Sequence, residues 1–325
     1  MDLKQRILAL VSDDLDDIEK ALTDNLHPNL ELVSRVANHI LFSGGKRLRP
    51  LLMVLSARLC GYNGDYDKTF SVIFEYLHAA TLLHDDLVDD ASLRRGVPAA
   101  HTVFGNETAV LVGDFLLARG LSIAADTGEP RIIKIISEIT ENMSQGEIHQ
   151  LDRKGKLDLS ESEYMDIIRS KTAVLFQGAC RISAILAGAS PEKESHLARY
   201  GYHLGMAFQM VDDLLDYSFD SIKLGKNVGA DLREGKLTLP VINALTKARA
   251  DDRELMQSII QNPGFTEKEF AWLTEKIANY GGIRYARETA SNHIKNACKA
   301  LASFPSSPTK DILGDIATYA LERKH

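Results

Sequence analysis

The sequence has few of the features that mark secreted, membrane-spanning or nucleic-acid-binding proteins. Its 325 residues include three cysteines, Cys60, Cys180 and Cys298, whose wide spacing matches neither a disulfide framework nor a zinc motif. The formal net charge is -7, so no nucleic-acid partner is expected. Residues 1–19 are acidic and amphipathic, unlike a secretory signal, and the most apolar stretch, residues 108–125, contains charged residues. We therefore expect a cytoplasmic protein without a transmembrane segment.

Aromatic residues and strand patterns are scarce as well, which favours an all-α protein. Aromatics make up 7% of the residues, whereas hydrophobic residues, mostly aliphatic, make up 45%. No linker or change of composition divides the sequence, so it predicts a single helical domain over residues 1–325, with an N-terminal helical segment at 1–27 of unassigned role. From the helical spacing of apolar residues, helices are predicted at about 3–18, 30–42, 50–60, 67–89, 106–126, 130–149, 161–189, 191–217, 237–248, 252–261, 267–280, 283–302 and 309–323.

Two acidic segments of matching form each end an apolar helix. They are DDLVD at residues 85–89 and DDLLD at residues 212–216. Residues four apart share a helix face, so the first and last aspartates of each segment project together. Two like charges about 4 Å apart repel by roughly 4 kcal/mol at an effective dielectric near 20, so each segment needs cations. A solvated helix end would explain one such segment but not two of matching form, and neither has the glycine and glutamate of an EF-hand loop. Oxygen-only ligands favour Mg²⁺, with substrate phosphate completing its coordination.

Cationic residues that a diphosphate would need gather in several short segments. The segment 44–50 (GGKRLRP) places three cations before a helix, where glycines allow close backbone approach and the helix N-terminus adds its dipole. Taken singly, each cation could be an ordinary surface residue, and His78 a packed core histidine. The residues that could bind diphosphate are Lys46, Arg47, Arg49, His78, Arg94, Arg95, Lys171, Thr172, Gln209, Lys226 and Lys236.

Together these segments resemble the long-chain trans-polyprenyl diphosphate synthases, specifically the bacterial octaprenyl to decaprenyl diphosphate synthase group. The resemblance follows the family's order from about residue 30 to the end of the chain. It rests on GGKRLRP at 44–50, LLHDDLVDDASLRRG at 82–96, LVGDFLLAR at 111–119, SKTAVLF at 170–176, GMAFQMVDDLLD at 205–216 and GKNVGADLREGKLTLP at 225–240.

The resemblance implies the all-α isoprenoid synthase fold, a large helical bundle around a central cavity. It implies a prenyltransferase that condenses isopentenyl diphosphate head-to-tail (1′-4) onto an allylic diphosphate such as farnesyl diphosphate. The implied product is a long all-trans polyprenyl diphosphate, octaprenyl to decaprenyl, for quinone side chains such as that of ubiquinone. The implied cofactor is Mg²⁺, about three ions per active site with substrate bound.

Roles carry over residue by residue. The catalytic set is Asp85, Asp86, Asp89, Lys171, Asp212, Asp213 and Asp216, of which Asp85, Asp89, Asp212 and Asp216 are metal ligands. Contacts to the allylic diphosphate are implied for Arg94, Lys171, Thr172, Gln209 and Lys226, and contacts to isopentenyl diphosphate for Lys46, Arg49, His78 and Arg95. Asp231 and Lys236 match a mobile segment near the metals. The glycine-rich stretch 225–235 is predicted to act as a lid.

Product length is predicted from small residues near the first acidic segment. Thr81 and Ala80 lie four and five residues before Asp85, and bulky residues there would close a tunnel for the growing chain early. The predicted tunnel residues are Phe74, Leu77, Ala80, Thr81, Gly120 and Ala124. Ordinary helix packing would also explain these small residues.

The sequence also has to be weighed against other classes of protein. A shorter-chain farnesyl or geranylgeranyl diphosphate synthase would keep both acidic segments. A subunit of a heteromeric synthase generally loses one of them, so we expect a homodimer. A terpene cyclase usually replaces the second DDxxD and has no need of GGKRLRP, and a helical scaffold would leave six clustered aspartates unexplained.

Overall fold

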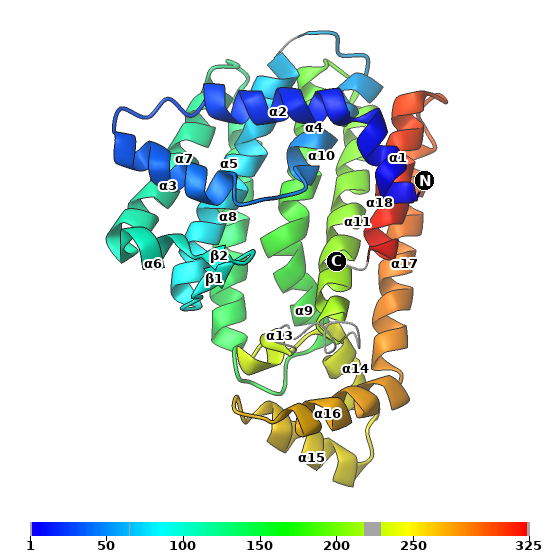
Figure 1. Ribbon diagram of the computed structural model, residues 1–325. Coiled ribbons are helices and arrows are strands. Elements are labelled where there is room, and N and C mark those ends of the chain that lie inside the picture. Colours follow the sequence, from blue (N-terminus) through cyan, green and yellow to red (C-terminus); the bar gives the residue numbers. More distant parts are fainter. Residues whose placement is uncertain (1, 65, 218–228, 324–325) are drawn as a thin grey trace. The chain divides into compact units, whose positions relative to one another are not determined.

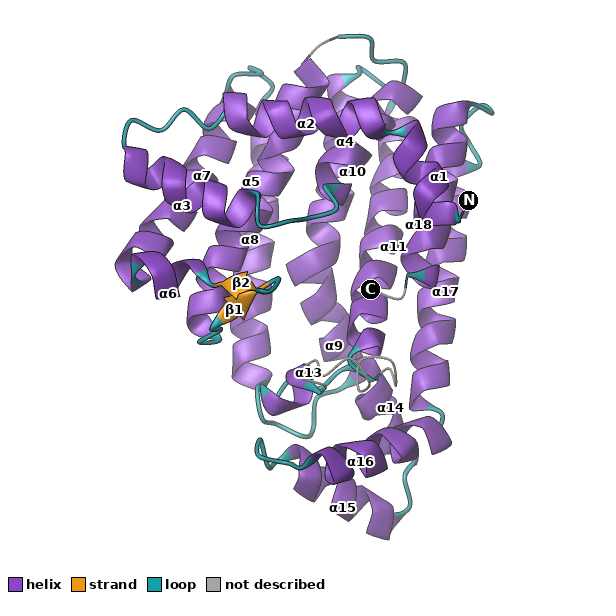
Figure 2. Cartoon of the chain, in the orientation of Figure 1, coloured by secondary structure: helices purple, strands orange, loops and turns teal. Residues whose placement is uncertain are grey.

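The structure, a computed structural model, describes residues 2–64, 66–217 and 229–323, which are almost entirely helical (Figures 1 and 2). The chain divides into two compact units. Unit 1 comprises residues 1–140, 178–198 and 303–313, and unit 2 comprises residues 141–177, 199–302 and 314–325. The predicted all-α fold is confirmed, whereas the single domain stays a prediction.

Unit 1 is built around helix α5 (Tyr66–Val88), which ends in the first acidic segment. Its side chains Phe70, Phe74 and Tyr76 are fully buried, and the Tyr76 hydroxyl donates to the carbonyl of Leu22 (2.6 Å). Helices α2, α3, α4 and α7 pack on α5. The elements that lie wholly in unit 1 are α1 (Leu3–Leu10), α2 (Ser12–Asp24), α3 (Glu31–Leu41), α4 (Leu48–Leu59), α5, β1 (Leu93–Arg94), β2 (Val97–Pro98), α6 (Ala100–Phe104) and α7 (Asn106–Ala125).

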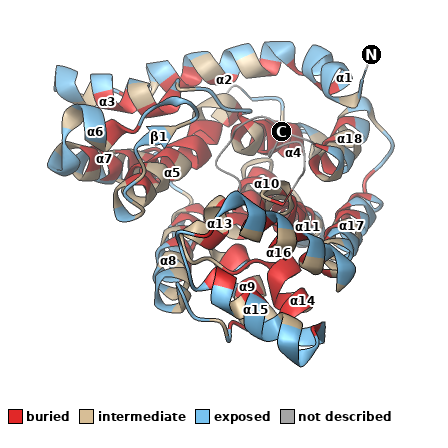
Figure 3. Cartoon of the chain, turned by 60° about the horizontal axis from the view of Figure 1, so that its bottom comes forward, coloured by how far each residue is buried: buried red, intermediate tan, exposed pale blue. Residues whose placement is uncertain are grey.

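The N-terminal segment forms two helices where the sequence predicted one. Val11 leaves the helical conformation (φ -121°, ψ 12°) with its side chain buried, and α2 starts at once with Asp13 and Asp14 in its first turn. In Figure 3, α2 shows buried residues along one side and exposed residues along the other. Asp14 forms an ion pair with Arg58 of α4, so this segment packs into unit 1.

Unit 2 contains the second acidic segment and the chain around it. Helices α14 and α17 pack together, and α16 packs against α14, α15 and α17. The elements that lie wholly in unit 2 are α9 (Glu161–Ile168), the π-helix η1 (Arg169–Ala173), α13 (Ala230–Arg233), α14 (Leu239–Lys247), α15 (Ala250–Ile260), α16 (Glu267–Asn279) and α17 (Gly282–Leu301). Both units receive residues from α8 (Pro130–Arg153), α10 (Val174–Leu186), α11 (Pro191–Leu215) and α18 (Pro308–Glu322).

Candidate active site

A cavity of about 160 Å³ lies in unit 2 and is lined largely by polar side chains. The sequence predicted many of these side chains. Those are Lys171, Thr172, Gln209, Asp213, Asp231 and Lys236. The residues come from η1, α11 and the stretch around α13, so the fold gathers segments that lie far apart in the chain.

The π-helix η1 presents Lys171 and Thr172 to this cavity. It interrupts the α-helical path between α9 and α10, and such bulges change the direction of the side chains that they carry. The backbone of η1 approaches α8 at Gly146, where an added Cβ would lie 2.7 Å from the Cβ of Ser170 and 3.1 Å from the nitrogen of Lys171. The close approach of the two helices therefore depends on the glycine at position 146.

Hydrogen bonds connect Thr172 to the second acidic segment. The Thr172 hydroxyl donates to the amide oxygen of Gln209 (2.7 Å), and the Gln209 amide nitrogen donates to Asp213 Oδ1 (2.8 Å). The buried Tyr164 hydroxyl donates to Asp213 Oδ2 (2.6 Å). Both oxygens of Asp213 are thus engaged, which fixes Gln209 and Asp213 in orientation.

Lys171 is held by two residues of α8. Its ammonium group forms a short ion pair with Glu147 and donates to the side-chain oxygen of Gln150 (3.1 Å). Glu147 is only 16% exposed and Lys171 22%, so the pair is largely shielded from solvent. Lys171 therefore stands at a defined place on the cavity wall.

The other two aspartates of the second acidic segment differ in their surroundings. Asp216 accepts from the backbone N–H groups of Gly229, Ala230 and Asp231 at 3.1–3.2 Å and so anchors the start of α13. Asp212 is 41% exposed and pairs with Arg323. Among these three carboxylates, Asp212 is the most open to an incoming ligand.

The carboxylates of the second acidic segment and Asp231 lie in surroundings that favour a bound cation. Burial, with repulsion from Asp212 and Asp216, raises the pKa of Asp213 to about 6. Burial also raises the pKa of Asp216, although backbone N–H groups oppose the shift. The pKa of Asp231 lies well above its ordinary value because of burial and repulsion from Asp213 and Asp216. These carboxylates carry more negative charge than their surroundings stabilise.

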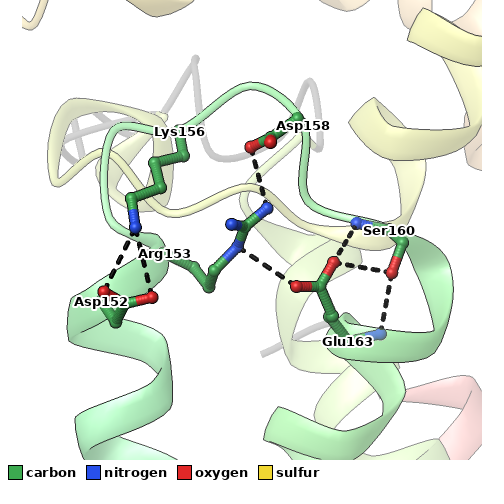
Figure 4. Close-up of polar contacts among 6 residues, drawn as sticks. All are labelled: Asp152, Arg153, Lys156, Asp158, Ser160 and Glu163. Atoms are coloured by element: carbon green, nitrogen blue, oxygen red, sulfur yellow. Dashed lines mark hydrogen bonds and ion pairs between the residues drawn. The ribbon is translucent and has the colours of Figure 1, made fainter.

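Residues of the loop between α8 and α9 line one side of the cavity. Figure 4 shows the polar contacts that hold this loop. Arg153, at the end of α8, pairs with Asp158 (2.8 Å) and Glu163 (3.4 Å). Ser160 and Glu163 form a capping box at the start of α9, in which each side chain accepts from the other's backbone N–H. Arg153 lines the cavity, yet its charge is matched by two carboxylates, so it holds the loop in place.

In unit 1, the first acidic segment is joined to the hairpin that follows it. Asp86 is 1% exposed, and its Oδ1 accepts from Arg94 Nε (2.8 Å). Its Oδ2 is buried without a hydrogen-bond partner in the described part of the chain. Arg94 pairs with Val97 across strands β1 and β2, and the turn residues Arg95 and Gly96 both have positive φ. The sequence did not predict this hairpin.

Two of the predicted isopentenyl diphosphate residues, Arg49 and Arg95, lie close enough to His78 to act on it electrostatically. Burial and the charges of Arg49, Arg95, Arg94 and Arg47 hold the pKa of His78 well below its ordinary value. Four guanidinium groups therefore act on a neutral imidazole, which suits an anion.

Arg47, which the sequence counted only among the residues that could bind diphosphate, is engaged within the protein. Its side chain is 5% exposed and pairs with Glu19 (2.6 Å) and Glu75 (2.8 Å). It also donates to the Leu41 carbonyl (2.6 Å). Arg47 thus ties the segment 44–50 to α2 and α5, because its donors are engaged by internal acceptors. This gives residues 1–27 a role in packing.

We expect Arg47→Met to lower the free energy of unfolding by about 3 kcal/mol, because Glu75 would be left buried without this partner. Lys46→Met, at an exposed neighbouring position, is the control and should change it by less than about 0.5 kcal/mol. Urea unfolding measures both. Equal effects would contradict the assignment, whereas adding Glu75→Gln to Arg47→Met should restore part of the loss.

The predicted tunnel residues lie in or beside the core of unit 1. Phe74, Leu77 and Ala80 are at most 1% exposed. Gly120 lies beside Ile73 and Leu77, where an added Cβ would be in ordinary contact with their side chains at 3.6–3.7 Å. Thr81 is half-buried and Ala124 fully buried, and the tunnel stays a prediction.

The structure says less about Lys226, Lys46 and the predicted lid. Lys226 lies outside the described residues, as does the beginning of the predicted lid at 225–228. The described part, from Gly229 onwards, is anchored by Asp216. Lys46 is exposed.

Residues that the sequence analysis missed complete the cavity and its supports. They are Glu147, Gln150, Tyr164 and Arg323. Glu147 and Gln150 belong to an ordinary amphipathic helix, and only their spacing of three, which places both on one face, hints at a shared partner. Arg323 lies at the end of the chain and carries no local motif.

Comparisons with known proteins agree on one family. The polyprenyl synthetase family model matches residues 30–277. Octaprenyl diphosphate synthase of Escherichia coli (strain K12) is 37% identical over 319 residues, covering 98% of each chain. A polyprenyl synthase from Caulobacter crescentus CB15, solved as a complex with calcium and isoprenyl diphosphate, is 37% identical with a TM-score of 0.91, covering 99% of this chain and 98% of that one. A decaprenyl diphosphate synthase from Rhodobacter capsulatus is 36% identical with a TM-score of 0.93, covering 99% of each.

Proposed function

Because the chain belongs to the polyprenyl synthetase family, whose members transfer prenyl groups, we propose that it makes a long all-trans polyprenyl diphosphate. It condenses isopentenyl diphosphate head-to-tail onto an allylic diphosphate such as farnesyl diphosphate, and the product is octaprenyl to decaprenyl. The observation that carries the proposal is the cavity of unit 2, where Lys171, Thr172 and Gln209 adjoin carboxylates with raised pKa values. The names of the related octaprenyl and decaprenyl synthases support the long product.

We propose Mg²⁺ as the cofactor, because the two acidic segments supply oxygen ligands only, the kind that this cation prefers. Asp213, Asp216 and Asp231 carry charge that burial disfavours, and Asp86 has a buried oxygen without a hydrogen-bond partner among the described residues. Asp85 and Asp89 would hold metal in unit 1, and Asp212 and Asp216 in unit 2. About three Mg²⁺ ions per site are proposed, and a related structure contains a divalent cation, calcium. When bound, the metal stabilises the charge that develops on the departing diphosphate.

The chain's own residues bind and orient the two substrates. In unit 2, Lys171 donates to the allylic diphosphate, and Thr172 and Asp213 hold Gln209 so that its second amide hydrogen makes the same contact. In unit 1, Arg49 and Arg95 bind the isopentenyl diphosphate beside a His78 that is neutral at physiological pH. Fixed cations around a leaving diphosphate favour its charge without reorganising during the reaction. The carbon framework then needs a dry apolar surface, since water would capture an allylic cation.

A product assay tests this function. Purified protein with labelled isopentenyl diphosphate, farnesyl diphosphate and Mg²⁺ should yield products that chromatography sizes as octaprenyl to decaprenyl, and EDTA should abolish them. Products stopping at farnesyl or geranylgeranyl length, with a shorter allylic primer, would make this a short-chain synthase. If the purified protein incorporates no isopentenyl diphosphate by itself but does so when a second protein is added, it is a subunit of a heteromeric synthase.

Helix α7 is proposed to be the contact between two copies of the chain. Leu111 is 65% and Leu121 37% exposed, on the side of α7 opposite its buried residues. By length and composition alone, α7 is apolar enough to cross a membrane. Core helices of soluble proteins pass the same test. A second copy fits better than lipid because Glu107 and Asp114 share this exposed side.

Leu111→Asp is therefore expected to convert a dimer to a monomer, because it places a charge in the apolar contact. Light scattering after size-exclusion chromatography measures the mass, and Leu255→Asp, at an exposed leucine of α15, is the control. A wild-type monomer, or a dimer that survives Leu111→Asp, would overturn this interface. Vesicle binding that Leu111→Asp abolishes would identify lipid as the occupant instead.

The cellular setting is also a proposal. The net charge of -7 and the reduced-cysteine pattern support a cytoplasmic enzyme, with its product used for the side chain of a quinone such as ubiquinone.

A further inference from the structure

Arg323 occupies a site built for a guanidinium group. It follows α18 directly, and its side chain is 4% exposed. Its guanidinium carbon lies 3.7 Å from the centre of the Phe208 ring, and one terminal nitrogen donates to the Phe208 carbonyl (2.6 Å). The same nitrogen lies 2.7 Å from Asp212 Oδ1. Phe208 and Asp212 are four residues apart on α11, so one helix face supplies the ring, the carbonyl and the carboxylate.

This burial is costly for a surface contact. A buried guanidinium needs charge and hydrogen-bond partners, yet Arg323 Nε is buried without a hydrogen-bond partner in the described residues. The cost falls just after the end of α18, although helix ends usually fray. The compensating interaction is the ion pair with Asp212, so the site is organised around that carboxylate.

Asp212 also has fewer partners within the protein than the other two aspartates of its segment. Asp213 accepts from Tyr164 and Gln209, and Asp216 accepts from three backbone N–H groups. Asp212 has its Oδ1 against Arg323 and remains 41% exposed. The cation that neutralises Asp212 in this structure is thus a side chain of the protein itself.

We propose that Arg323 is an internal counter-ion of Asp212, which takes the place of the divalent cation in the metal-free chain and competes with it. The inference rests on the proposed function in so far as Asp212 is a metal ligand. A contact that stabilises only the metal-free form weakens metal binding by the same factor that it stabilises that form. Arg323 therefore sets how much metal the site requires, and metal binding loosens the end of α18.

Arg323→Gln tests the competition without measuring catalysis. We expect its melting temperature to fall by about 4 °C in EDTA and by clearly less with Mn²⁺ and inorganic diphosphate. Calorimetric titration of Mn²⁺ in the presence of inorganic diphosphate should show affinity at least about fivefold tighter than in the wild type. Arg253→Gln is the control, because Arg253 in α15 donates to the carbonyls of Thr246 and Ala248. It should lower the melting temperature equally in both conditions.

A double variant separates charge compensation from simple docking of the helix end. If Arg323 serves Asp212, Arg323→Gln with Asp212→Asn should melt higher in EDTA than Arg323→Gln alone. Additive losses, or an Arg323→Gln deficit unchanged by Mn²⁺ together with unchanged Mn²⁺ affinity, would overturn the proposal. If Arg323→Gln does not fold, its rescue by Asp212→Asn supports the proposal and failure of rescue refutes it. If the wild type binds no Mn²⁺ in the presence of inorganic diphosphate, the metal site of the proposed function is refuted. The melting temperatures in EDTA would still show whether Arg323 compensates the charge of Asp212.

Discussion

Replacing Lys171 by methionine is expected to lower kcat/KM for the allylic diphosphate by about 10²- to 10³-fold. The side chain ends on the wall of the unit 2 cavity, where the π-helix presents it and Glu147 and Gln150 hold it. A fixed cation acts most strongly as the diphosphate leaves, because its charge then increases. The loss should therefore appear in kcat as well as in KM. Steady-state kinetics with farnesyl diphosphate as the varied substrate measures both.

Stability must be separated from chemistry in this experiment. Removing Lys171 alone leaves Glu147 as a largely shielded carboxylate without its cation, which costs about 3 kcal/mol or more. Lys171→Met is therefore best made together with Glu147→Gln, which removes both charges. Lys156→Met is the matched control, since Lys156 forms an exposed pair with Asp152 (3.2 Å) at the edge of the same region (Figure 4). That pair should contribute under about 1 kcal/mol, with activity unchanged.

A double variant that keeps wild-type kcat/KM would remove Lys171 from the diphosphate site. A loss confined to the melting temperature, with kinetics intact below it, would exclude Lys171 from that site as well. A Glu147→Gln variant that retains Lys171 should be more active than the double variant. That result would show that Glu147 supports the lysine and is not itself required.

The parts of this site that repeat a local pattern could be predicted from the sequence. Asp212 and Asp216 lie four apart on an apolar helix, so their common face follows from helix geometry alone. Lys171 and Thr172 were identified by resemblance, and both line the cavity together with Gln209. The hydrogen-bond partners of each carboxylate could not be predicted from the sequence. Asp213 is held by Tyr164 from another helix, a contact between residues 49 positions apart.

The features that the sequence analysis missed depend on long-range contacts or on backbone conformation. Arg47 looked like a substrate residue because a cation beside two glycines suits an anion, yet its partner Glu75 comes from α5. The break at Val11 interrupts an unbroken helical pattern. The π-helix leaves no mark in composition, because a bulge inserts one residue into an otherwise helical run. Only the hairpin turn had a usable signal, since Arg95-Gly96 places a glycine where positive φ is required.

Ala80→Tyr is expected to shorten the product by several isoprene units while leaving the first condensation intact. Ala80 is fully buried one turn before the first acidic segment, on the helix that carries it. If the growing chain passes along α5, a phenol ring at this position would block a path that is about as wide as a prenyl chain. Product analysis by chromatography from farnesyl diphosphate measures the length.

The matched control is Ala79→Tyr, because Ala79 is also buried but points about 100° away around the same helix. Both variants overpack the core of unit 1 at a cost of about 1–3 kcal/mol, so melting temperatures must be compared before product lengths. Shortening by Ala80→Tyr but not by Ala79→Tyr would place the chain along the Ala80 face of α5. The Leu77 side chain lies beside Gly120, so Leu77→Ala, which removes bulk at this place, should then lengthen the product further. Identical products from the wild type and a folded Ala80→Tyr variant would reject this path, and the length of the product would have to be set by other residues.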